Sequence, residues 1–221
     1  MPLPLLIAAA LGAVGLTWVL RRANLTRAAR RAAYFDGVVD LFDRVSKRID
    51  PSGFPRITGH SVALAFDLQA VPDSLTFRKL PALWVMLSLP EPVPVAATLD
   101  IMTRPSGHET FSHFNTLPDS LPCPDFLPVG TGVRSDNASL VPQPDVLARH
   151  AGIFTDERVK ELLISPNGLR IVMLADEADR GRYLLFRDAE LGRTAFRAGD
   201  MERLMAALLA LRSDLMMRES A

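Results

Sequence analysis

Residues 162–174 read LLISPNGLRIVML, two apolar runs that flank a Pro-Asn-Gly turn. An Asn-Gly pair accommodates the positive φ angles of a tight turn, so this stretch predicts a β-hairpin with antiparallel arms. The hairpin sets the expected fold class, which is an α+β domain built on a mostly antiparallel sheet with flanking helices.

Other stretches carry strand patterns. Residues 61–71 alternate between apolar and polar, which predicts a half-buried strand whose core face carries Val62, Leu64, Phe66, Leu68 and Ala70. Short apolar runs bounded by turn residues predict three more strands, at residues 83–89, 97–103 and 129–134. A reversal at residues 179–181 is expected to lead into a further strand at residues 183–186.

Helical patterns occur toward both ends of the chain. Apolar residues recur at three- and four-residue steps over residues 25–49, which predicts one amphipathic stem helix. The same steps over residues 200–217 predict a C-terminal helix that buries Met201, Leu204, Met205, Leu208, Leu211 and Leu215. A short helix is expected at residues 145–152, and a helical turn capped by Asp156 is expected to reach Lys160.

The chain therefore divides into three parts. Residues 1–20 form an apolar segment, residues 21–50 the basic and amphipathic stem helix, and residues 51–221 the α+β domain. Within that domain, residues 104–128 form a long loop with five prolines, and loops of this length are typically functional or mobile.

The apolar segment has the features of a transmembrane helix. Leu3–Leu20 is uncharged, and its 18 residues give roughly 27 Å of helix, close to the hydrocarbon thickness of a bilayer. Five arginines follow within eleven residues, at Arg21, Arg22, Arg27, Arg30 and Arg31. They are expected to lie at the membrane surface, where they contact anionic headgroups or only set the topology.

The position of these charges predicts the orientation. Positive residues gather on the cytoplasmic side of a membrane helix, so we expect the N-terminus outside and the domain in the cytoplasm, at a bacterial inner membrane. A cleaved signal peptide is the main competing interpretation, and the uncharged N-terminus disfavours it. A buried core helix of a soluble protein is the other alternative.

Composition supports a folded cytoplasmic domain. Basic and acidic residues balance at 25 each, so no overall field favours nucleic acid as a partner. The single cysteine, Cys123, cannot form an internal disulfide, which agrees with a reducing compartment. Only three of the 25 basic residues are lysine, and this bias is typical of GC-rich bacterial genomes.

Candidate chemical groups gather on the long loop. His108 and His113 are five residues apart rather than the four that place two imidazoles on one helix face, and Glu109 lies between them. Cys123 is flanked by prolines and followed by Asp125, which does not favour a thiolate. We therefore expect no catalytic residue, no metal and no cofactor.

The long loop also carries apolar residues that a partner could contact. Phe111, Phe114 and Phe126 are the interaction candidates, because large apolar side chains on an exposed loop form a contact surface. Ala8 and Gly12, four residues apart in the apolar segment, form a small-residue face that could pack against another membrane helix.

Three compact stretches have the look of family signatures: residues 78–84 (RKLPALW), 160–170 (KELLISPNGLR) and 180–188 (RGRYLLFRD). Together with the N-terminal apolar segment, they give a chain that resembles uncharacterised single-pass membrane-anchored proteins of bacteria. The resemblance implies a membrane-anchored domain and carries no activity and no site residues.

Three functional hypotheses follow. The leading one is a non-catalytic accessory or scaffold domain that binds the bilayer and a membrane-protein complex. The first alternative is a metal-dependent or thiol hydrolase that uses residues 108–123. The second is a small-molecule or lipid sensor with a pocket between the sheet and the C-terminal helix.

Overall fold

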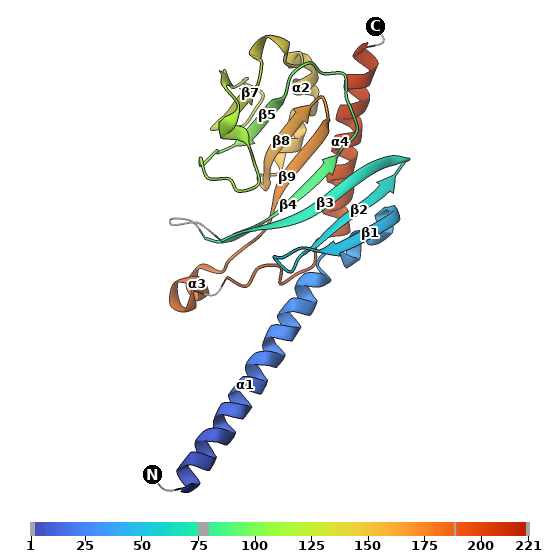
Figure 1. The fold of residues 1–221 in the computed structure, drawn as a ribbon. Helices are drawn as coiled ribbons and strands as arrows, with labels where there is room; N and C mark the ends of the chain where they lie inside the picture. Colours follow the sequence, from blue (N-terminus) through green and yellow to red (C-terminus); the bar gives the residue numbers. More distant parts are fainter. Residues whose placement is uncertain (1–2, 75–79, 188, 220–221) are drawn as a thin grey trace.

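The computed structural model describes residues 3–74, 80–187 and 189–219, with the side chains of residues 3, 5, 6, 218 and 219 left out. Residues 78–79 and 188, which belong to two of the stretches quoted above, lie outside the described residues. The fold is α+β: a large antiparallel sheet is flanked by helices, and one long helix projects from it (Figure 1).

The helices are α1 (Leu3–Ala32), α2 (Pro144–His150), α3 (Arg180–Phe186) and α4 (Ala198–Glu219), and short 3₁₀ helices occupy Asp36–Leu41, Phe114–Thr116, Ala138–Leu140 and Ala151–Thr155. The strands are β1 (Asp43–Ile49), β2 (Pro55–Ser61), β3 (Leu64–Asp73), β4 (Ala82–Leu89), β5 (Leu99–Thr103), β6 (Asp119–Leu121), β7 (Thr131–Ser135), β8 (Val159–Ser165) and β9 (Gly168–Glu177).

These strands form one sheet in the order β1-β2-β3-β4-β9-β8-β5-β7-β6, and each neighbouring pair is antiparallel. The predicted hairpin lies at its centre, with Ser165 paired to Gly168 across the turn. Gly168 has a φ of +136°, and a Cβ there would lie 2.3 Å from the carbonyl oxygen of Leu89. Glycine is therefore required at the turn that joins the two central strands.

The main core lies between the sheet and α4, which packs against β4 and β9. The predicted stripe on this helix is confirmed, because Met201, Leu204, Met205, Leu208, Leu211 and Leu215 are all buried. The strands predicted at residues 83–89, 97–103 and 129–134 are also confirmed, as β4, β5 and β7 with small shifts at their ends.

The predicted stem helix is wrong in its second half. Helix α1 ends at Ala32, and residues 43–49 form strand β1 at the edge of the sheet. The Asp50–Phe54 turn, in which Gly53 has a φ of +82°, pairs β1 with β2. The helical spacing of Val45 and Ile49 is therefore a coincidence, and the folded domain begins near Tyr34 rather than at residue 51.

The strand predicted at residues 61–71 begins later than expected. Val62 and Ala63 both have positive φ angles and form a two-residue turn that pairs Ser61 with Leu64. Val62 is therefore 77% exposed instead of buried, whereas Phe66, Leu68 and Ala70 face the core as predicted. Strand β2, which lies before this turn, was not predicted from the sequence.

Two other local predictions are wrong at positions where an aspartate side chain accepts a hydrogen bond from a nearby backbone N–H. Residues 180–186 form helix α3 instead of a strand, because the Asp179 side chain caps it by accepting a hydrogen bond from the Arg182 N–H at 2.7 Å. Asp156 caps no helix: its side chain accepts from the Arg158 N–H at 3.0 Å, and the chain enters β8 at Val159.

Helix α1 runs for 30 residues and leaves the domain at one end, so that its N-terminus lies far from the sheet (Figure 1). Within the described residues, none of the helices combines the length and the apolar composition that crossing a membrane requires.

Candidate functional site

The N-terminal half of α1 exposes an apolar surface. Its large side chains are each 53–68% exposed, and they are Ile7, Leu11, Val14, Leu16, Trp18, Val19 and Leu20. Figure 1 shows this half of the helix extending away from the other elements. Soluble domains rarely leave so continuous an apolar surface uncovered, so this half of α1 is the most unusual feature of the molecular surface.

The five arginines that follow divide into two groups. Arg21 and Arg22 are exposed beside the apolar half, and the Arg22 guanidinium lies 5.4 Å from the centre of the Trp18 ring. Arg27, Arg30 and Arg31 lie where α1 meets the domain and line a small crevice there. Of the five arginines predicted to lie at the membrane surface, only Arg21 and Arg22 are therefore beside the apolar half of α1.

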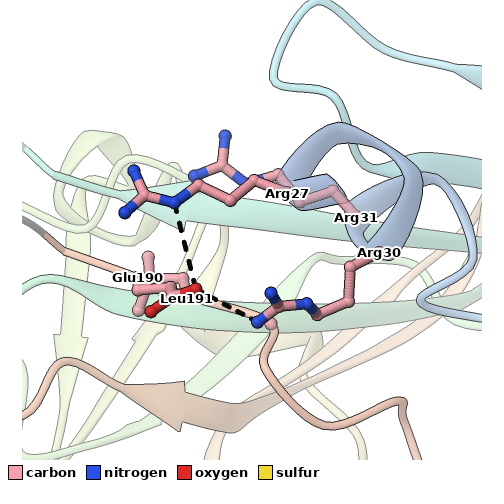
Figure 2. A pocket seen from close by; sticks show the side chains of 6 residues that line it. Arg27, Arg30, Arg31, Glu190 and Leu191 are labelled. Carbon is pink, nitrogen blue, oxygen red and sulfur yellow. Dashed lines mark hydrogen bonds and ion pairs between the residues drawn. The ribbon is translucent and has the colours of Figure 1, made fainter. Parts of the chain in front are cut away.

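Glu190 links α1 to the domain. Its carboxylate accepts a hydrogen bond from Arg30 at 3.1 Å and lies 4.0 Å from Arg27 Nε, as Figure 2 shows. The other carboxylate oxygen lies 3.1 Å from Arg182 of α3. One acidic side chain thus connects α1 to α3, although Arg30 and Glu190 are 160 residues apart in sequence.

The crevice lined by these residues and by Leu191 and Gly192 has a volume of about 20 Å³. A cavity needs roughly 10–15 Å³ to hold one water molecule, so the crevice has room for a water and not for an organic ligand. The interactions observed in its lining are the contacts of Glu190 with Arg27 and Arg30 of α1.

An aromatic cluster fixes the C-terminal end of α1 more firmly. The Tyr34 ring lies 5.1 Å from Phe35 and 5.4 Å from Phe54, and the Tyr34 carbonyl accepts a hydrogen bond from the Phe196 N–H. Burial and the nearby Asp176 carboxylate raise the pKa of Tyr34. The helix therefore emerges from a packed base and not from a flexible linker.

The long loop covers the second face of the sheet. Phe111 and Phe114 are buried against Met102 and Val172, and the Phe111 ring centre lies 5.0 Å from that of Trp84. Phe126 is half-buried and packs against the main core. The prediction of an exposed contact surface is therefore wrong for Phe111 and Phe114, which cover the apolar side chains on this face of the sheet. Phe126 is in part exposed, but it belongs to the main core.

Beneath the same loop lies a carboxyl pair that the sequence reasoning missed. Asp100 on β5 and Glu161 on β8 are 1% and 0% exposed, and the Ser112 hydroxyl of the loop hydrogen-bonds to Glu161 and lies 3.5 Å from Asp100. Arg170 on β9 pairs with Glu161 at 3.0 Å. Acidic residues inside two apolar strand segments are the sequence signal that could have indicated this pair.

Electrostatics set the charge of this pair. Burial and the neighbouring Glu161 carboxylate raise the pKa of Asp100 to about 8, against the lowering effect of Arg170. Asp100 is then protonated at neutral pH, while Glu161 has Arg170 as its counter-ion. Because both carboxyls are sealed from solvent, the arrangement holds the loop on the sheet and offers no route for a substrate.

The hydrolase candidates on the loop are not brought together as a site. Burial raises the pKa of Glu109, but hydrogen bonds from Ser106 and the Lys160 charge outweigh it and lower the value to about 2. Lys160 lies 3.3 Å from this carboxylate. Cys123 is exposed, and the described residues contain no group of three side chains with the arrangement of a metal site.

Two hollows lie between the sheet and the C-terminal helix. One, of about 500 Å³, is open to solvent and lies between Leu64 of β3 and the C-terminal part of α4. The other, a cavity of about 160 Å³, lies between α4 and β8, lined by residues that include His150, Leu162 and Leu211. His150 is occupied there by Asp214, at 3.0 Å. Ligand pockets typically measure 300–1,000 Å³ and enclose most of the ligand. The 160 Å³ cavity is below this range, and the 500 Å³ hollow has the volume but lies open to solvent.

Comparison with known proteins gives no further constraint: no family model, no curated protein and no solved structure matches the chain. The function must therefore be argued from the geometry described above.

Proposed function

We propose that the chain is a membrane-tethered accessory domain. In this proposal the apolar half of α1 inserts into a bilayer, and the α+β domain is held at the cytoplasmic face of a bacterial inner membrane. There it contributes to a membrane-protein complex without catalysing a reaction. The observation that carries the proposal is the apolar half of α1, whose large side chains are exposed from Ile7 to Leu20.

Taken over its full sequence, including residues whose side chains lie outside the described part, the segment has a length and an insertion energy that agree with insertion. The uncharged run Leu3–Leu20 contains nine Leu, Ile or Val residues, three of which (Leu3, Leu5 and Leu6) have side chains outside the described part. Each such residue contributes roughly −0.3 to −0.6 kcal/mol on insertion scales, which gives about −3 to −5 kcal/mol in total. Trp18 lies near the end of the run, where an indole ring favours the membrane interface.

The orientation rests on the charges that follow the run. Arg21 and Arg22 are exposed on the domain side, and positive residues stay on the cytoplasmic side of a membrane helix. The exposed free thiol of Cys123 is compatible with a reducing cytoplasm.

A membrane-protein partner is supported by the surface of α1 itself. A Cβ added at Gly12 or Gly15 would meet no described atom within 4 Å beyond the helix's own backbone, so both positions are open to close approach. Small residues spaced four apart, as at Ala8 and Gly12, allow two membrane helices to pack closely.

The native cysteine offers a direct test of topology. Cys123 is the single cysteine and it is exposed, so a membrane-impermeant maleimide can report which compartment holds the domain. We expect labelling of spheroplasts only after permeabilisation, with Cys123→Ser as the control that removes the signal. Labelling of intact spheroplasts would contradict a cytoplasmic domain.

Native size tests the partner. We expect gentle detergent extraction from the original membranes to yield an assembly larger than the 24.2 kDa chain in its micelle. An isolated monomer under these conditions would contradict an accessory role, while leaving the membrane tether intact.

A further inference from the structure

Helix α3 exposes three consecutive apolar residues. Leu184, Leu185 and Phe186 are 58%, 78% and 73% exposed. Apolar side chains on protein surfaces are usually scattered singly, and a contiguous group of this kind typically marks a contact site. The proposed function gives α3 no role, so it does not explain why these three apolar side chains are exposed.

Strand register places α3 at the end of the domain from which α1 leaves. Glu177, two residues before the helix cap, pairs with Ala82 on β4, and Ala82 pairs with Asp73 on β3. The turn at Val62 lies at the other end of β3, about 30 Å away, given roughly 3.3 Å per strand residue. Figure 1 shows α3 at the same end of the domain as the C-terminal part of α1, to its left.

Contacts fix this position. Arg182 of α3 and Arg30 of α1 both lie 3.1 Å from the Glu190 carboxylate, one at each oxygen. Arg27 lies 4.0 Å from the same group. The apolar group on α3 is therefore held at a set height along α1.

The position of α3 along the axis of α1 is close to the expected membrane surface. Arg27 and Arg30 follow Leu20, the last residue of the apolar run, by seven and ten residues, or about 10–15 Å of helix. A headgroup layer is roughly 5–8 Å thick on each side of the hydrocarbon core. A helix with its side chains is about 10 Å across. The width of α3 therefore spans the distance that remains between the arginines of α1 and the outer edge of the headgroup layer.

The charges around α3 also fit a bilayer. Arg180 and Arg187 are exposed at the two ends of the helix, next to the apolar group. Asp179 is engaged in capping the helix, and Glu190 is shared among arginines. Apolar residues flanked by arginine are characteristic of elements that lie in the interface of a membrane with anionic lipids.

We propose that α3 is a second membrane contact, in which Leu184, Leu185 and Phe186 enter the headgroup region of a phospholipid bilayer while Arg180 and Arg187 face anionic headgroups. This inference rests on the proposed function, because the tether α1 brings the bilayer to this end of the domain. Two contacts then fix the orientation of the domain on the membrane.

A fluorophore at Leu185 tests the proposal in the full chain. The variant Leu185→Cys, in a Cys123→Ser background, is labelled with an environment-sensitive dye. It is then reconstituted into vesicles of phosphatidylcholine and phosphatidylglycerol in equal parts. The matched control is Val62→Cys, since Val62 is 77% exposed and lies at the far end of β3.

We expect a blue-shifted emission at Leu185 and quenching by spin-labelled lipids that is several-fold stronger than at Val62. Equal, weak quenching at both sites in chains that float with the vesicles would overturn the α3 contact alone. A blue shift without lipid quenching would also overturn it, because a protein surface would then cover α3. Chains that do not float with vesicles at all would instead contradict the α1 tether.

Discussion

At the scale of single residues, Asp100 is a carboxyl in an unusual environment. It is sealed beneath the long loop, where Glu161, Arg170 and the loop Ser112 face it, and Arg134 lies opposite it in register on β7. Its pKa of about 8 means that the folded state keeps a proton that the unfolded chain releases near pH 4.

The consequence is a stability that falls with rising pH. Because the folded state binds the extra proton, the contribution of Asp100 is fully present below about pH 4 and is lost as the pH rises through about 8. We expect the free energy of unfolding to drop by about 2 kcal/mol or more between pH 5 and 9. Urea titrations of the full chain in mild detergent, followed by Trp84 fluorescence in a Trp18→Phe background, measure it.

Asp100→Asn should flatten this pH dependence, since the amide cannot ionise. The matched control is Asp125→Asn, which changes an exposed carboxyl on the same loop and should leave the dependence intact. An Asp100→Asn protein that loses stability with pH as steeply as the parent would show that another group is responsible.

Gly168 is the second residue with a sharp prediction. A Cβ at this position would meet the Leu89 carbonyl at 2.3 Å while the backbone holds a φ of +136°, so Gly168→Ala should destabilise the domain by about 2 kcal/mol or more. Gly199→Ala is the control, because nothing lies within 4 Å of a Cβ there and alanine favours a helix. Equal unfolding midpoints for the two variants would contradict this account of the hairpin turn.

At the scale of elements, the long loop behaves as a cover for the sheet. Phe111 is 7% exposed against Trp84, whereas Phe186 on α3 is 73% exposed, which gives two phenylalanines in opposite environments. We expect Phe111→Ala to cost about 3–5 kcal/mol of unfolding free energy and Phe186→Ala to cost under about 0.5 kcal/mol. In the Trp18→Phe background, acrylamide quenching of Trp84 should rise only in the first variant, and unchanged quenching there would mean that the loop does not shield the sheet.

The elements that the sequence predicted are those whose signals are local. The Asn-Gly turn and the apolar stripe of α4 carry their own pattern, and both are found as predicted. Strand β1 could not be recognised, because Val45 and Ile49 match a helical spacing by coincidence and only pairing with β2 makes the segment a strand. The predicted burial of Val62 is wrong because the turn at residues 62–63 contains no glycine or asparagine, the residues that usually indicate a two-residue turn.

The candidate site was predictable only in part. The apolar run and its arginines are readable in sequence, but the division of those arginines depends on Glu190, which lies 160 residues from Arg30. The burial of Phe111 likewise depends on Trp84, a strand residue far from it in sequence, whose ring lies beneath the loop. Such long-range contacts leave no local pattern.

At the scale of the whole molecule, the protein is a packed α+β domain with a projecting helix. The aromatic cluster around Tyr34 and the shared carboxylate of Glu190 fix α1 to the sheet at the end where α3 exposes its apolar group. In the proposed function, a helix held in this way transmits the position of the bilayer to the domain. The function proposed above therefore depends on one property, the ability of the apolar half of α1 to tether the domain to a membrane.

Flotation of the reconstituted chain with phospholipid vesicles in a density gradient, after an alkaline wash, tests this tether. The informative variant is Leu11→Arg with Val14→Arg, because both side chains are 68% exposed and two arginines at the centre of a membrane helix cost about 5–7 kcal/mol. That cost exceeds the gain of about 3–5 kcal/mol from the apolar residues of the run. The control, Val62→Arg, places a charge at an exposed valine in the turn between β2 and β3.

We expect the parent chain and Val62→Arg to rise with the vesicles, while the double variant stays at the bottom of the gradient with an unchanged unfolding midpoint. A parent chain that stays at the bottom, or a double variant that floats as well as the parent, would contradict a membrane tether in α1.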